Sequence, residues 1–355
     1  RKLFYSGSNY KNEILTYNTL GLLTGIDVDS GALVNEIISR DWLGNVLKIQ
    51  YKRPGSDLGD VYDLDNFDRL SGAALGVGSS EWGDSFSNIT GYSDKKLVFA
   101  LDKASNREQV DKYDSEGNLE TQYNLASGTN RYASYVETLN NNQPVTTLVT
   151  YDNNGNLIWD GEHFYEYDYL DRLCGVWTYG SSLMRNIARS STVTHKDYCI
   201  LLSAAKKQYP VDTVLANPTS PSLQKSYTSS SLQLVALYAY DAGGRRCIKA
   251  LNKVASYGIA WDGWRRAEEY IETSGTGSAY QIRRVFFDGN GVDEHIGYAY
   301  TSDGGTSWTR YTFLQGHLGH VRAVTNNNGN IVEQYLYDPY GRRRVYDSSW
   351  TLRPT

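Results

Sequence analysis

Apolar and aromatic residues fill short stretches of this chain, and clusters of Asp, Asn and Gly separate one stretch from the next. Within the stretches, tyrosines recur two positions apart, as at Tyr165 and Tyr167 or at Tyr335 and Tyr337. Successive side chains of a β-strand point to opposite faces, so residues two apart share a face. The pattern predicts strands that carry an aromatic stripe and are joined by tight turns.

The residues at each interruption predict the tip of a β-hairpin. In Glu166-Tyr167-Asp168 the Tyr ends a strand, and the Asp side chain can accept a hydrogen bond from a backbone amide two residues further on. A Gly two or three residues later supplies the positive φ that such turns require. Apolar residues then resume, as in Asn156-Leu157-Ile158, so the chain returns as a second strand.

This unit is copied along the chain, which marks a repeat protein. The repeat-defining residues are Tyr62-Asp63 with Asp68-Arg69-Leu70, Tyr113-Asp114 with Gly117-Asn118-Leu119, Tyr151-Asp152 with Gly155-Asn156-Leu157, Tyr167-Asp168 with Asp171-Arg172-Leu173, Tyr240-Asp241 with Gly244-Arg245, and Tyr337-Asp338 with Gly341-Arg342. Degenerate copies occur at Tyr17-Asn18, Asp41 and Trp261-Asp262.

These units resemble the YD repeats of the Rhs family, which includes bacterial Rhs proteins and the shells of teneurins and of the Tc-toxin C component. The stretch from Leu314-Gln315-Gly316 to Asp338-Pro339-Tyr340-Gly341-Arg342 is similar to the end of an Rhs core. The resemblance covers most of the chain, except about residues 71–110 and 175–232. It implies an all-β fold in which an antiparallel sheet of β-hairpins spirals into a shell or cocoon, with this chain forming part of the shell.

Composition supports strands and turns over helices. The chain has 30 Tyr and 33 Gly but only 7 Pro and 1 Met. Its net charge is -5 and the basic residues are scattered, which disfavours nucleic acid or an anionic membrane surface as a partner, because phosphate binding needs concentrated Lys and Arg. No apolar run reaches the roughly 18 residues that a membrane-spanning helix needs.

We expect one continuous YD-repeat β domain over residues 1–355, as a fragment of a larger protein, with an insertion at residues 175–232. A second break, from Ser71 to Ser87, is rich in Gly and Ser. Insertions on a rigid repeat scaffold fall in loops, and loops carry recognition. Any ligand should therefore bind at these two segments, and the alternative is that they are loops without a ligand.

Metal-binding signals are weak. His317 and His320 stand three residues apart, but no further zinc ligands accompany them. Asp27 begins a short acidic cluster without the distal Glu of a calcium loop, so turn capping is the simpler interpretation. We expect no metal site and no cofactor, and no loss of stability when metal ions are chelated.

Catalytic signals are weak as well. Residues 301–308 match an Asp-box, which we interpret as a stable β-turn. Asp338-Pro339 corresponds to only part of the segment with which self-cleaving Rhs toxins release an effector, so we do not expect autoproteolysis. No catalytic residue is expected, and the chain is not expected to be an enzyme.

The expected function is a non-catalytic scaffold, secreted or at the cell surface, that encloses or displays another polypeptide; the extracellular location is implied by the family resemblance alone. The alternatives are an adhesion or carbohydrate-binding module with surface glycan as partner, a structural subunit of a filament or surface layer, and an enzyme.

A repeating sheet exposes unpaired backbone groups at its first and last strands, and such edges recruit further strands. We expect the strand near Arg1 to Tyr5, the strand near Arg343 to Tyr346, or both, to pair with more of the same polypeptide or with an adjacent subunit. The competing interpretation is that the positive charges of Arg342-Arg343-Arg344 blunt the second edge.

Overall fold

The structure, a computed structural model, describes residues 2–4, 10–53, 56–115, 117–126, 128–140, 142–179, 232–251, 255–273, 279–289, 291 and 294–353. Within these ranges the regular structure is β-strand apart from two short 3-10 helices, η1 (Ser79–Glu81) and η2 (Phe86–Asn88). The predicted all-β antiparallel architecture is confirmed. None of the described segments forms a helix long and apolar enough to cross a membrane.

The described strands form two antiparallel sheets in which neighbours in sequence are neighbours in space, with 12 and 14 strands. The first sheet contains β1 (Lys2–Phe4), β2 (Tyr10–Tyr17), β3 (Leu23–Val28), β4 (Val34–Arg40), β5 (Val46–Arg53), β6 (Ser56–Leu64), β7 (Leu70–Gly78), β8 (Tyr92–Leu101), β9 (Arg107–Asp114), β10 (Gly117–Leu125), β11 (Tyr132–Leu139) and β12 (Val145–Leu148).

The second sheet continues in the same order. It contains β13 (Thr150–Tyr151), β14 (Leu157–Trp159), β15 (His163–Tyr167), β16 (Leu173–Tyr179), β17 (Leu232–Tyr240), β18 (Arg246–Leu251), β19 (Ala255–Asp262), β20 (Arg265–Glu272), β21 (Tyr280–Asp288), β22 (His295–Tyr300), β23 (Thr309–Gln315), β24 (Val321–Thr325), β25 (Ile331–Tyr337) and β26 (Arg343–Tyr346).

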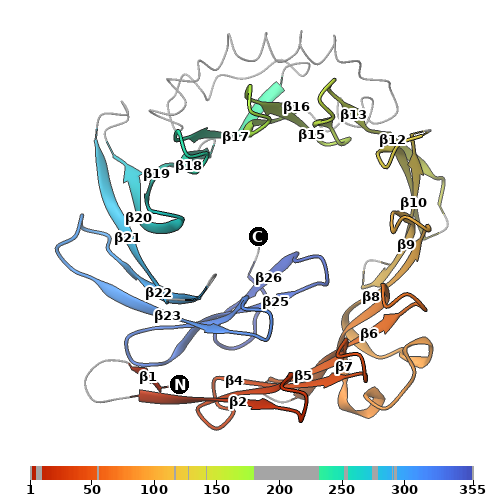
Figure 1. The fold of residues 1–355 in the computed structure, drawn as a ribbon, viewed down its shortest axis with the longest axis horizontal. Helices are drawn as coiled ribbons and strands as arrows, with labels where there is room; N and C mark the ends of the chain where they lie inside the picture. Colours follow the sequence, from red (N-terminus) through yellow and green to blue (C-terminus); the bar gives the residue numbers. More distant parts are fainter. Residues whose placement is uncertain are drawn as a thin grey trace.

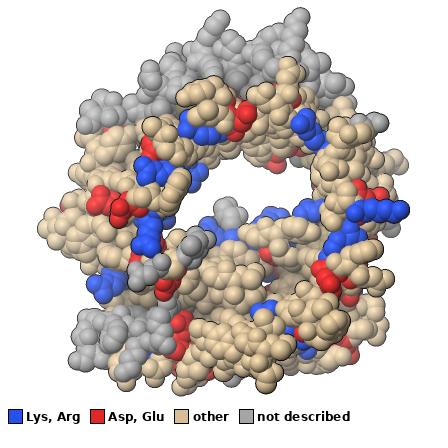
Figure 2. Space-filling view, viewed as in Figure 1, with Lys and Arg blue, Asp and Glu red and all other residues tan. Residues whose placement is uncertain are grey.

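Only Val149 separates β12 from β13, and its amide donates to the carbonyl of Ala133 at 3.0 Å, so the chain stays attached to β11 across this break. The two sheets together curl into an open ring (Figure 1). The space-filling view shows an opening through the centre of the ring, with Lys and Arg side chains on its border (Figure 2). Strands twist relative to their neighbours, and this twist lets a long sheet curl.

The last strands lie inside the ring and pack against the first strands (Figure 1). Two hydrophobic clusters join these layers. One contains Ile26, Val28, Val34, Leu314 and Ala323, and the other contains Ile49, Tyr51, Leu58, Leu336 and Tyr346. Each side chain of this size contributes about 1.5–3 kcal/mol when fully buried. The overlap of the layers therefore closes the ring as a sheet-on-sheet sandwich.

The interpretation of Ser71 to Ser87 as a break is wrong for its first half. β7 runs to Gly78, and its residues from Ala73 to Val77 are nearly all fully buried. The connection that follows folds back over this strand, so closely that a Cβ on Gly72 would lie 2.4 Å from the Phe86 ring. Gly72 leaves room for the Phe86 ring, and Ala74 packs in one hydrophobic cluster with Ile89 of the same connection.

The insertion begins later than predicted, because β16 continues to Tyr179. Most of the insertion, from residue 180 to 231, lies outside the described residues. At the ends of the sheets, β1 pairs only with β2 among the described strands, and β26 pairs with β25 and through a bridge from Tyr346 to Leu352. The pairing of these edges with further strands stays a prediction.

Candidate functional site

The turn at residues 168–172 shows how one repeat unit is built. The amides of Leu170 and Arg172 donate to Asp168 Oδ1 at 2.9 and 3.0 Å, and Arg172 Nε donates to Asp168 Oδ2 at 2.7 Å. Asp171 supplies the positive φ of 57°. The hydrogen bonds from Arg172 lower the pKa of Asp168, which keeps the carboxylate charged as a cap.

The same five-residue turn occurs at Asp152, Asp241 and Asp338. In each, the Asp carboxylate accepts the amide of the residue four positions later, at 2.8 to 2.9 Å. The residue three positions later has positive φ in all of them; it is Gly155, Gly244 or Gly341. The residue that closes the turn is Asn156, Arg245 or Arg342.

Neighbouring turns on one rim of the ring are hydrogen-bonded to each other. Arg172 Nη1 lies 3.4 Å from the carbonyl of Asp241 in the next turn, and its guanidinium lies 4.7 Å from the centre of the Tyr240 ring. The Tyr240 hydroxyl donates in the opposite direction, to the carbonyl of Leu173 at 2.7 Å. Adjacent turns are thus joined by two side chains, one reaching forward and one backward.

The backward contact of the repeat tyrosine recurs. The hydroxyls of Tyr167 and Tyr337 each donate at 3.0 Å to a backbone carbonyl at the start of the preceding strand, at Leu157 and Val321. Tyr335 is buried, and Tyr167, Tyr240 and Tyr337 are half-buried. The repeat tyrosine therefore packs its ring within the wall and bonds its hydroxyl to the neighbouring hairpin.

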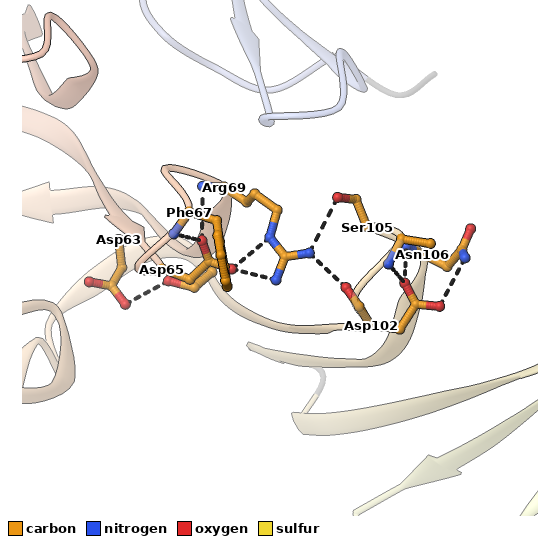
Figure 3. Close-up of polar contacts among 9 residues, drawn as sticks. Asp63, Asp65, Phe67, Arg69, Asp102, Ser105 and Asn106 are labelled. Carbon is orange, nitrogen blue, oxygen red and sulfur yellow. Dashed lines mark hydrogen bonds and ion pairs between the residues drawn. The ribbon is translucent and has the colours of Figure 1, made fainter.

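The first Tyr-Asp pair does not form such a turn. Tyr62 and Asp63 lie within β6, and the turn begins at Asp65, which accepts the amides of Phe67 and Arg69 at 2.8 and 3.1 Å (Figure 3). Arg69 Nη1 then reaches the carbonyl of Asp102 in the next turn at 2.6 Å (Figure 3). The turn lies two residues beyond the predicted one.

Tyr113-Asp114 also departs from the pattern. Asp114 pairs directly with Gly117 in a two-residue hairpin, and its carboxylate is 2.7 Å from Lys112 Nζ. Among the described residues, further turns of this type that the sequence analysis missed are at Asp102 with Asn106, at Asn326 with Asn330, and at Asp347 with Thr351. The signal for the last of these was present, because Tyr346-Asp347 is another Tyr-Asp pair.

Ion pairs link the two layers where the ring closes. Lys95 Nζ on β8 lies 2.9 Å from Asp338 Oδ2, across 243 positions of sequence. Arg344 on β26 pairs with Asp94, so this arginine holds the layers together rather than blunting an edge. The Tyr340 ring packs edge-on against Phe99 at 5.3 Å. We call these contacts, with the two hydrophobic clusters, the seam.

A buried charged cluster lies within the seam. Glu36 is 2% exposed, and its Oε1 is 2.5 Å from Arg322 Nε on β24. Burial raises the pKa of Glu36, but the opposing effects of Arg322, His317 and His320 are larger in sum and bring the pKa down to about 2. Glu36 shares its strand face with Val34 and Ile38, which are buried too. A charge on an apolar face was the sequence signal for this cluster.

Two further groups of the cluster titrate abnormally. Burial raises the pKa of Asp60 to about 6, although the Tyr51 hydroxyl and the Gly76 amide each donate to its Oδ1 at 3.0 Å. Burial lowers the pKa of His320 to about 4, despite the nearby carboxylate of Glu36. Both shifts follow from placing a titratable group in a region of low dielectric constant.

A cavity of about 350 Å³ lies beside this cluster. Its lining includes Glu36, Asp60, Tyr62, His317, His320 and Asp338. His317 and His320 are thus brought together with carboxylates, yet the described residues contain no group of three or more His, Cys, Asp or Glu side chains that could hold a metal ion. The carboxylates of Glu36 and Asp338 are engaged by Arg322 and Lys95.

The remaining sequence candidates form turns. Asp303 of the Asp-box accepts the amides of Thr306 and Ser307 at 3.0 Å, and Trp308 Nε1 donates to the carbonyl of Gly305 at 3.0 Å. Asp27 accepts the amide of Gly31 at 3.1 Å. Both segments show the hydrogen bonding of capped turns.

No protein-family model matches the chain, and no curated protein matches it. The solved structures to which this chain is similar include a TcdB2-TccC3-Cdc42 complex, at 9% identity and a TM-score of 0.40, with 97% of this chain covered. Another is a Photorhabdus luminescens Tc holotoxin pore, at 13% identity and a TM-score of 0.43, with 95% of this chain covered.

The chain spans 19% and 17% of the length of those two chains.

Replacing Tyr167 by Phe tests the backward contact of the repeat tyrosine. The substitution keeps the ring and removes the donor to Leu157, so the free energy of unfolding should fall by about 0.5–1.5 kcal/mol. The matched control is Tyr169→Phe, two residues on and 89% exposed, which should change stability by less than about 0.5 kcal/mol. Denaturant unfolding measures both, and equal effects would contradict the contact.

The seam should respond to pH through two opposing groups. The folded-state pKa of His320 is below its ordinary value of 6.5, so its contribution to stability is present above pH 6.5 and is lost as the pH falls towards 4. The folded-state pKa of Asp60 is raised, so its contribution is present below pH 3.8 and is lost as the pH rises through 6.

When the pH falls from 6.5 to 4, His320→Asn should therefore lose less stability than the wild type, because it lacks the histidine that becomes protonated. Asp60→Asn should lose more, because it lacks the stabilisation that protonation of Asp60 provides. Urea unfolding at pH 4, 5 and 6.5 gives the three curves. An unchanged pH dependence in His320→Asn would show that this histidine does not titrate in the seam.

Proposed function

We propose that this chain is part of a non-catalytic shell, secreted or at the cell surface, whose curved sheet encloses or displays another polypeptide. One observation carries the proposal. The sheet curls until its last strands pack over its first, so that it forms a wall around an open centre (Figures 1 and 2). A wall that closes on itself through a packed seam is suited to containing a guest.

The chemistry of the seam supports a scaffold over an enzyme. The carboxylates nearest the cavity are held by cations or by hydrogen bonds within the protein: Glu36 by Arg322, Asp338 by Lys95, and Asp60 by Tyr51 and Gly76. Glu36 and Asp338 thereby join the two layers, and all three carboxylates have little freedom to exchange protons with a substrate. We propose that the shell needs no metal ion or cofactor.

A second candidate is a subunit that assembles with adjacent copies. The most exposed large apolar side chains, 72% to 89% exposed, lie in the tips of hairpins: Leu20, Trp42, Phe67, Tyr169, Trp264 and Leu318. In an antiparallel sheet every second hairpin turns on the same rim, and these hairpins belong to one such set, since β12 and β13 run in the same direction across Val149. Apolar groups gathered on one surface favour association with a partner.

Limited proteolysis of the intact polypeptide from its source tests enclosure. We expect a protected segment beyond the residues of the wall. Lys95→Ala combined with Arg344→Ala removes two ion pairs of the seam and should speed the digestion of the protected segment. The control Lys103→Ala, at an exposed turn position, should leave protection unchanged.

If the wild-type protein protects no such segment, enclosure is contradicted. The molar mass of the same sample by light scattering distinguishes the second candidate, since a subunit of an assembly should exceed the mass of one polypeptide.

A further inference from the structure

A second pocket, of about 500 Å³, lies between the β19–β20 hairpin and the connection from β21 to β22. Its wall includes Arg246, Trp261, Trp264, Arg266, Asp288 and Glu294. The pocket is separate from the seam, and none of these residues belongs to the repeat-defining set. Cationic, aromatic and carboxylate side chains thus meet on one concave surface.

The arginines provide an anion site. The Arg266 guanidinium lies 3.7 Å from the centre of the Phe286 ring, which fixes its plane, and its nearest described carboxylate contact is a 3.9 Å approach to Glu269. Glu269 is already paired closely with Arg284. Among the described residues no carboxylate forms an ion pair with Arg246. A planar guanidinium held in this way suits a bidentate contact with a carboxylate.

The two tryptophans provide apolar faces. Trp261 Nε1 donates to the carbonyl of Arg246 at 3.0 Å, which fixes the indole beside that arginine. Trp264 is 82% exposed at the tip of the hairpin, where Arg245 donates to the carbonyl of Gly263 and holds the turn. The C–H face of a sugar ring packs on such an indole, while its hydroxyls stay polar.

The carboxylates of the pocket select among anions. Asp288 Oδ1 is 2.7 Å from His295 Nδ1, and Glu294 Oε2 accepts the amide of Gly291 at 3.0 Å. A carboxylate offers about four acceptor sites, so both can also accept hydrogen bonds from ligand hydroxyls. Their negative charge repels a group that concentrates two charges at one position, such as phosphate, more strongly than a single carboxylate.

We propose that this pocket binds a hexuronic-acid unit of an acidic polysaccharide. The sugar carboxylate pairs with Arg246 and Arg266, the ring packs on Trp264, and the hydroxyls donate to Asp288 and Glu294. The proposal stands whether or not the wall encloses a guest, because the pocket is formed by one face of three neighbouring hairpins.

Isothermal titration calorimetry with an oligogalacturonide and with its fully methyl-esterified form tests the pocket. The ester keeps the sugar and removes the charge. We expect the acid to bind at least 10-fold more tightly than the ester, and expect acetate and inorganic phosphate to bind at least 10-fold more weakly than the acid. Failure to bind the oligogalacturonide, or equal affinity for acid and ester, would overturn the proposal, as would tighter binding of acetate or phosphate.

Variants locate the site. Trp264→Ala and Arg246→Gln change exposed side chains, so each should weaken binding at least 10-fold and leave the thermal midpoint within about 2 °C of the wild type. The matched control is Trp42→Ala, which removes an equally exposed tryptophan from another hairpin tip. Equal weakening by Trp42→Ala, or none by Trp264→Ala and Arg246→Gln, would place binding elsewhere and refute the assignment.

Discussion

The carboxylate-capped turn is the interaction on which the wall depends. A two-stranded hairpin is marginal in water, so it needs a fixed register and a neighbour on each side. The cap at Asp168 fixes the register by holding the amides of Leu170 and Arg172. Arg172 and Tyr240 then join this turn to the next one. Local folding and assembly of the sheet are thus accomplished by the same few side chains.

Closure of the ring buries charged side chains between the two layers, away from water. The attraction within a buried ion pair offsets the cost of desolvating the two charges only when its geometry is good. Removal of one partner leaves the other charge buried and unpaired. Glu36 and Arg322 form such a pair across the two layers. Apolar side chains around Leu314 and Leu336 supply the driving force, while the ion pairs of Glu36 and Asp338 form only where the two layers meet. The seam therefore combines apolar burial, which does not depend on direction, with ion pairs, which do.

Local chemistry could be predicted from the sequence, whereas contacts across the ring could not. The turn at Asp168 depends on residues within five positions, and it was predicted correctly in kind and place. The turn near Tyr62-Asp63 was misplaced because Asp63 and Asp65 stand two residues apart, and local rules permit either as the cap. Glu36 could have been flagged as a charge on an apolar face, but its partner Arg322 becomes evident only once the sheet has curled.

Carbodiimide cross-linking followed by mass spectrometry tests the closure of the ring most directly, because it couples a lysine to a carboxylate in contact without a spacer. The structure brings Lys95 and Asp338 to 2.9 Å across 243 positions. We predict a cross-linked peptide that joins these two residues within one chain, including in an equal mixture of light and isotope-labelled protein. Absence of this peptide, or its formation only between light and labelled chains, would contradict a wall that closes on itself.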